Sequence, residues 1–134
     1  MQYFVTGATG FIGRFLVAEL LTHANAHADI RVFPLVRPES EAKLDALRTR
    51  LGVTPQQLVA VHGNLEQPRL GLSGDTLSSL TGAIDHFFHL AALYDLKADA
   101  PAQEKANIGG TRNALDAAAA LRASCFHHVS SIAA

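Results

Sequence analysis

Three glycines near the start of the chain have the spacing of a turn that holds a phosphate group. They lie in the segment Thr6-Gly7-Ala8-Thr9-Gly10-Phe11-Ile12-Gly13. Gly7 would let the chain turn tightly out of a strand, Gly10 would leave room for a pyrophosphate, and Gly13 would let a helix pack closely. The N-terminus of that helix directs free N–H groups and a partial positive charge at the phosphates. We therefore predict a dinucleotide site that includes Gly7, Thr9, Gly10, Phe11, Ile12 and Gly13.

Two arginines indicate which dinucleotide the site would hold. An NAD site commonly has an acid at the end of the second strand, and this chain has Arg37 in that region. Arg14 lies just inside the helix that follows the glycines. A guanidinium can pair with a 2′-phosphate through two hydrogen bonds and keeps its charge. We predict NADP(H) bound through Arg37 and Arg14, with a solvated surface charge as the alternative for each arginine.

Strand-like and helix-like patterns alternate along the chain and would position these residues. The predicted strands cover 3–5, 30–36, 58–61, 84–90 and 125–129. The predicted helices cover 11–21, 39–51 and 99–121, with a short helical turn at 75–80. Parallel neighbours need crossover connections, and these are right-handed. The pattern predicts a Rossmann-type α/β fold, a doubly wound parallel sheet of five strands in order 3-2-1-4-5 with helices on both faces.

Length, charge and cysteine content restrict the class of protein. The 134 residues suffice for one domain, so we expect a single NADP(H)-binding domain over 1–134. The formal net charge of −1 provides no footprint for nucleic acid or an anionic membrane. There is no 18-residue apolar run and no signal-peptide pattern. Cys125 is the single cysteine, which is compatible with a reducing compartment, and we expect a cytoplasmic protein.

The glycine segment resembles the Thr-Gly-x-x-Gly-x-x-Gly signature of extended short-chain dehydrogenases/reductases. Four further segments match that family in the expected order: Gly63-Asn64-Leu65, His89-Leu90-Ala91-Ala92, Asn107-Ile108-Gly109-Gly110-Thr111-Arg112-Asn113 and Val129-Ser130-Ser131. The resemblance covers essentially the whole chain. It implies that Asn64 and Leu65 lie at the adenine, and that Ala91, Ala92 and Asn107 belong to the cofactor site. It also implies that Ser131 is a catalytic residue that orients the substrate carbonyl.

Three shorter segments resemble the fatty acyl-CoA reductase and thioester reductase branch of that superfamily. They are Leu35-Val36-Arg37, Gly71-Leu72-Ser73 and His89-Leu90-Ala91-Ala92-Leu93-Tyr94-Asp95. This resemblance implies NADP(H)-dependent reduction of a small-molecule carbonyl or acyl thioester by hydride transfer. The alternatives are a sugar-nucleotide epimerase or dehydratase, a dihydroflavonol-type ketone reductase, and a dinucleotide-binding module without chemistry.

The proton donor that the family resemblance implies has no match in this chain. Family members use a tyrosine in a Tyr-x-x-x-Lys pair, in which the lysine lowers the tyrosine pKa. The tyrosines here are Tyr3, at the start of a predicted strand, and Tyr94, which is three residues rather than four before Lys97. We therefore expect a truncated domain that is inactive by itself. Its last predicted strand would be an exposed edge, which favours a homo-oligomer.

Seven histidines raise the question of a metal site. His127 and His128 are adjacent on one predicted strand and would face opposite sides of the sheet. The same argument separates His86 from His89 on another strand. No Cys/His pair has zinc-site spacing along the chain. We predict no metal site, and we interpret Cys125 as a buried strand residue.

Overall fold

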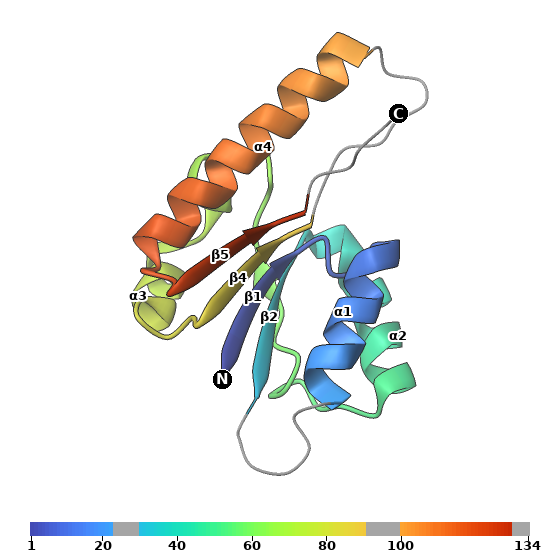
Figure 1. Cartoon of the computed structure of the whole chain (residues 1–134). Helices are drawn as coiled ribbons and strands as arrows, with labels where there is room; N and C mark the ends of the chain where they lie inside the picture. Colours follow the sequence, from blue (N-terminus) through green and yellow to red (C-terminus); the bar gives the residue numbers. More distant parts are fainter. Residues whose placement is uncertain (23–29, 91–99, 130–134) are drawn as a thin grey trace.

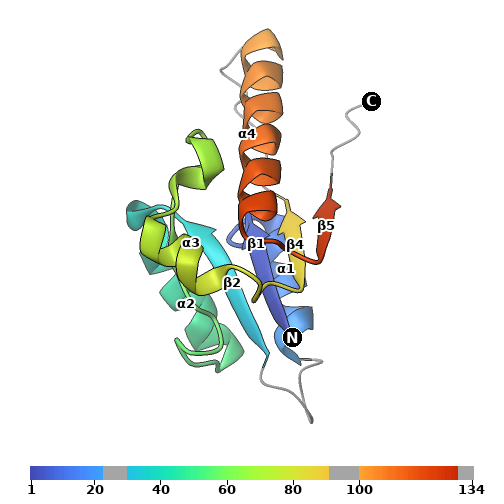
Figure 2. The same ribbon diagram turned by 90° about the vertical axis from the view of Figure 1, so that its left-hand side faces the viewer.

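The computed structural model describes residues 1–22, 30–90 and 100–129, which form a parallel sheet covered by helices on both faces (Figures 1 and 2). The sheet order is β3-β2-β1-β4-β5, which confirms the predicted fold and strand order. The strands are β1 (Gln2–Thr6), β2 (Arg31–Val36), β3 (Val61–His62), β4 (His86–His89) and β5 (Cys125–His128). β1 lies at the centre of the sheet, so the turn that follows it lies midway along the row of carboxyl-terminal strand ends.

The helices divide between the two faces of the sheet. α1 (Phe11–Thr22) and α2 (Glu41–Leu51) cover one face, and α3 (Gly74–Leu80) and α4 (Ala100–Ala120) lie on the other (Figure 1). Two short 3₁₀ turns, η1 (Pro38–Ser40) and η2 (Pro68–Gly71), precede α2 and α3. The predicted helix over 39–51 therefore begins as a 3₁₀ turn at a proline, which suits a first helical position because it has no N–H to leave unpaired.

Alternation along the central strands builds two hydrophobic cores. Val5 and Val32 face α1 and α2, where they pack with Val17, Leu44, Leu47 and Leu58. Phe4 and Phe87 face the other side, where their rings stack 4.7 Å apart and pack with Leu70, Ala114, Ala117 and Leu121. β1 and β2 contribute buried residues to both cores and are therefore mostly apolar, whereas β4 and β5 carry half-buried and exposed histidines.

The third strand is shorter and later than the sequence pattern predicts. The prediction covers 58–61, whereas β3 is Val61–His62 and Leu58 forms only an isolated bridge with Val32. The backbones of Val32 and Val36 bond to this neighbouring segment at Gln57, Val59 and Gly63. Pro34 lies midway between them and has no N–H to donate. The ladder is therefore interrupted between the bridge and β3.

Two further expectations concern association through an edge strand and a membrane-spanning helix. Among the described residues, β3 and β5 form the two edges of the sheet. Association through the β5 edge stays a prediction. No helix in the described ranges has the length and hydrophobicity needed to cross a bilayer.

Candidate nucleotide-binding site

The glycine turn connects the end of β1 to the beginning of α1. Gly7 has φ +76°, a conformation that favours glycine, and its carbonyl accepts a hydrogen bond from Gly10 N at 3.1 Å. A Cβ at Gly13 would lie 1.9 Å from Gly7 O, so this helical residue packs directly on the turn. These observations confirm the turning task of Gly7 and the packing task of Gly13. The task predicted for Gly10 concerns a ligand and stays a prediction.

A first cavity, of about 230 Å³, opens beside the glycine turn. It lies where the carboxyl ends of β1, β2 and β3 meet, the edge at which open α/β sheets bind their ligands. Its walls come from the turn, the end of β2, the segment after β3, and α4. The lining residues are Gly7, Thr9, Leu35, Val36, Arg37, Ser40, Gly63, Leu65, Glu66 and Ala106.

Arg37 is tied to the segment after β3 at the mouth of this cavity. Its Nη2 lies 3.5 Å from Asn64 Oδ1, and that oxygen also accepts a hydrogen bond from Glu66 N at 2.9 Å. The contact is long and exposed, so it orients the guanidinium weakly and leaves it available to a ligand. Asn64 thus reaches the site through its contact with Arg37.

A second cavity, of about 310 Å³, lies between α1 and α2 and shares Thr9 with the first. Arg14, Lys43 and Arg50 line it, together with Ala46 and Leu47. Arg14 Nε is buried without a hydrogen-bond partner. Among the described residues no acidic side chain pairs with these three cations. Three cations around one cavity, one of them with an unsatisfied buried donor, suit an anionic ligand.

The structure brings together some of the predicted cofactor residues and separates others. Four of them line the first cavity: Gly7, Thr9, Arg37 and Leu65. Arg14 lines the second cavity, so the two predicted arginines are in different cavities on either side of Thr9. Phe11 and Ile12 are exposed at the beginning of α1, and Asn107 is half-buried in α4 beside Ala106. Ala91, Ala92 and Ser131 lie outside the described residues.

Sequence reasoning missed several residues around these cavities. Lys43 and Arg50 are seven residues apart on α2 and therefore share one helix face, a spacing visible in the sequence. Ser40, Glu66 and Ala106 are adjacent to predicted elements but carry no motif of their own. What the sequence does not show is that Lys43 and Arg50 line the same cavity as Arg14.

A buried histidine was also missed as a support of the glycine turn. His89 Nδ1 lies 2.8 Å from Thr6 Oγ1, and His89 Nε2 lies 3.3 Å from Thr111 Oγ1 in α4. Thr6 Oγ1 also accepts a hydrogen bond from Leu90 N at 3.1 Å. The network is satisfied when Thr6 donates to Nδ1 and a neutral His89 donates from Nε2. It links β4 and α4 to the residue that precedes Gly7.

His89 is expected to make the fold sensitive to acid. Burial, followed by repulsion from His128, lowers the pKa of His89 from 6.5 to about 4. The folded protein thus keeps this ring neutral, whereas the unfolded chain takes up a proton below pH 6.5. The contribution of His89 to the free energy of unfolding is fully present above pH 6.5 and is lost as the pH falls towards 4. This loss lowers the free energy of unfolding by about 3 kcal/mol. Urea denaturation at a series of pH values measures this loss.

A His89→Gln variant provides the control for that titration. Glutamine does not titrate, so the free energy of unfolding of this variant should fall less steeply between pH 6.5 and 4 than that of the unmodified protein. His128→Gln should reduce the slope by a smaller amount, since His128 is the lesser cause of the pKa shift. An unchanged slope in His89→Gln would place the acid sensitivity in other groups.

Comparison with known proteins identifies relatives over nearly the whole chain. The profile of an NAD-binding family described as "Male sterility protein" matches residues 5–134. A linear gramicidin synthase of Brevibacillus parabrevis is 35% identical over 96% of this chain, and an aldehyde reductase of Aspergillus flavus is 36% identical over 98%. This chain spans 3% and 13% of the length of these two proteins.

A solved structure agrees with the sequence comparison. The reductase (R) domain of a nonribosomal peptide synthetase from Mycobacterium tuberculosis superimposes with a TM-score of 0.75 at 28% identity. The match covers 97% of this chain and 33% of that one. The fold of this chain is therefore that of part of a larger reductase domain.

Proposed function

This chain belongs to the NAD-binding family described as "Male sterility protein", within the extended short-chain dehydrogenases/reductases, and we propose that it forms the NADP(H)-binding part of a reductase. Its relatives include an aldehyde reductase, an L-2-aminoadipate reductase and the reductase domain of a nonribosomal peptide synthetase. The proposed reaction is hydride transfer to a carbonyl or an acyl thioester of a small molecule. Because the chain spans a small part of its relatives, the activity of the whole protein is a proposal.

The geometry of the glycine turn supports a bound dinucleotide. The backbone of Gly10 does not have a positive φ, and Gly10 is exposed. The fold itself gives only a weak reason for glycine there, a Cβ contact of 3.3 Å with Gly7 O, whereas a pyrophosphate that approaches the helix N-terminus gives a stronger one. The neighbouring cavity would take one end of the dinucleotide, because 230 Å³ is below the usual size of a complete ligand pocket.

The cations on either side of Thr9 support NADP(H) over NAD(H), and this observation carries the cofactor proposal. Arg37 follows β2 directly, at the position where an NAD site places its acid. Arg14 and Lys43 line the adjoining cavity. Among the residues of the first cavity the acid is Glu66, which comes from the segment after β3 and is exposed. We propose that Arg37 pairs with the 2′-phosphate and that the second cavity adds positive potential.

The residues of this chain would bind and orient, while the reduced nicotinamide supplies the hydride when bound. Ser131, which lies outside the described residues, is proposed to orient the carbonyl through its hydroxyl. Tyr3 pairs with His86 at the start of the strands, so it lies at the opposite end of β1 from the glycine turn and does not supply a proton there. This assignment is tested in the whole protein by following the loss of NADPH absorbance with aldehydes and acyl thioesters as substrates. The Ser131→Ala variant should abolish that loss.

Removal of Arg37 should reduce the preference for the phosphorylated cofactor. Calorimetric titration should show that NADP(H) binds more tightly than NAD(H). In Arg37→Ala most of the difference in affinity between NADP(H) and NAD(H) should disappear. A charge-assisted pair contributes about 1.5–3 kcal/mol, or about 10- to 100-fold in affinity. NAD(H) affinity should change little, because it has no 2′-phosphate for the guanidinium to contact.

Arg31→Ala is the matched control for that substitution. Arg31 is exposed at the first residue of β2, at the opposite end of the same strand from Arg37. Its removal should leave both affinities unchanged. Equal affinity for NADP(H) and NAD(H) in the unmodified protein would refute the cofactor proposal. If Lys43→Ala reduces the difference in affinity between NADP(H) and NAD(H) and Arg37→Ala does not, the 2′-phosphate lies in the second cavity instead.

A further inference from the structure

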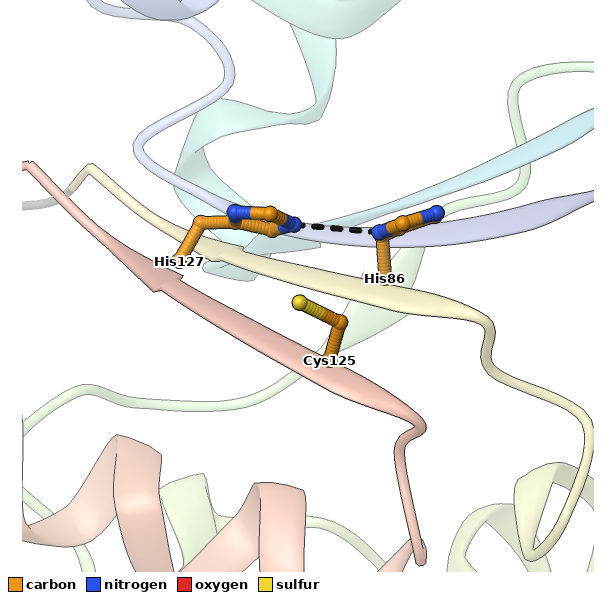
Figure 3. A group of neighbouring side chains, drawn as sticks. All are labelled: His86, Cys125 and His127. Carbon is orange, nitrogen blue, oxygen red and sulfur yellow. Dashed lines mark hydrogen bonds between the residues drawn. The ribbon is translucent and has the colours of Figure 1, made fainter.

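Two histidines and the single cysteine come together on one face of the β4–β5 pair. In the parallel register, His86 lies opposite Cys125, and Phe88 lies opposite His127. Cys125 and His127 are two residues apart on β5, so their side chains project from the same face as that of His86. Figure 3 shows the three side chains directed toward one another. The cluster therefore forms across strands, between residues that are far apart in the chain.

The donor atoms are close enough to share one ion. His86 Nδ1 and His127 Nε2 lie 3.0 Å apart, and the ligand atoms of all three residues lie within 4.8 Å of one another. Tetrahedral zinc with ordinary bond lengths requires about 3.3 Å between two nitrogens and about 3.6 Å between nitrogen and sulfur. The imidazoles thus need a shift of a few tenths of an ångström, and the thiol needs to approach by at most roughly 1 Å.

Aromatic rings on this face pack against both imidazoles and limit their movement. The Tyr3 ring stacks on His86 at 5.6 Å, and the Phe88 ring stacks on His127 at 4.5 Å. All three ligand candidates are half-buried. Three protein donors in a partly exposed position leave a fourth coordination position to water, as in many zinc sites. Without a metal, the two nitrogens share one hydrogen bond, and a metal ion would use both lone pairs.

We propose that His86, Cys125 and His127 form a binding site for a divalent ion of the Zn²⁺ class. The site is separate from the proposed cofactor site. His86 is level with Tyr3, whereas the glycine turn follows Thr6, three residues and about 10 Å further along β1. His127 is level with Val5 but lies on β5, two strands away from β1. The bound ion would join β5, an edge strand of the described sheet, to β4. It would stabilise the folded state more strongly as the metal concentration rises, because the unfolded chain does not hold the three donors together.

Cobalt provides a direct test, because thiolate ligation produces a near-ultraviolet charge-transfer band. Metal-free protein, prepared with a chelator, should bind one equivalent of Co²⁺ with that band, and Zn²⁺ should displace it. Cys125 is the single thiol in the sequence, so the band would come from that residue. Cys125→Ser should abolish the band, and His86→Gln or His127→Gln should weaken Co²⁺ affinity at least about tenfold.

His128→Gln is the matched control, since His128 lies on the same strand but stacks with His89 on the opposite face. This variant should keep the band and the Co²⁺ affinity, and Cys125→Ser should keep NADP(H) affinity. Circular dichroism checks that each variant folds, and alkylation of Cys125 should be slower in the presence of Zn²⁺. The absence of a thiolate band, or Co²⁺ affinity that survives both Cys125→Ser and His86→Gln, would overturn the proposal.

Discussion

A Gly13→Ala variant is expected to lose at least about 3 kcal/mol of folding free energy, the upper part of the range for an overpacked core. The added Cβ would lie 1.9 Å from Gly7 O and 2.8 Å from both Gly7 C and Ala8 Cα. All three are backbone atoms, so no side chain can rotate away. Gly7 is also held by its hydrogen bond from Gly10 N and by β1, which is buried at the centre of the sheet. Either α1 moves away from the strand or the turn changes shape.

Denaturation by urea, followed by circular dichroism, measures this loss. Gly109→Ala is the matched control, because Gly109 is also a helical glycine and an added Cβ there would meet no atom within 4 Å. That substitution should raise stability by up to about 1 kcal/mol, since alanine is the better helix former. A Gly13→Ala variant as stable as the unmodified protein would show that the turn adapts at little cost.

The strand order could be predicted because each strand of the sheet centre is a short apolar run between helical patterns. β1 and β2 contribute buried residues to both hydrophobic cores, so local pattern and final environment agree there. The third strand fails this rule for a local reason. Pro34 is a residue of β2, but its missing N–H removes a hydrogen bond between β2 and the segment that contains β3. The interruption therefore appears in β3, although the residue that causes it lies in β2.

The candidate site could be predicted where one continuous segment forms it. The glycine turn and Arg37 each follow a strand end, and a parallel sheet brings such ends to one edge. Contacts between separate elements could not be predicted in the same way. Arg14 and Lys43 line one cavity only after α1 and α2 are in place, and His86 meets His127 only in the β4–β5 register. The prediction of no metal site rests on neighbours along one strand and does not consider pairs across strands.

Gly10→Val should abolish detectable binding of NADPH and NADH and leave the fold intact. The Cβ would have its nearest contact at Gly7 O, 3.3 Å away, which a shift of a few tenths of an ångström relieves. Gly10 has no positive φ and is exposed, so valine is compatible with the backbone. Its branched side chain would, however, stand at the N-terminus of α1, where the free N–H groups are proposed to receive the pyrophosphate.

Calorimetric titration with both cofactors, together with thermal unfolding, measures the two parts of that prediction. Gly74→Val is the matched control, since Gly74 begins α3 and has no atom within 4 Å of a Cβ. It should leave cofactor affinity unchanged. Gly10→Val that binds as tightly as the unmodified protein would place the pyrophosphate away from the turn. Gly10→Val that fails to fold would show that Gly10, like Gly13, is required by packing, because a ligand requirement alone predicts a folded protein that does not bind.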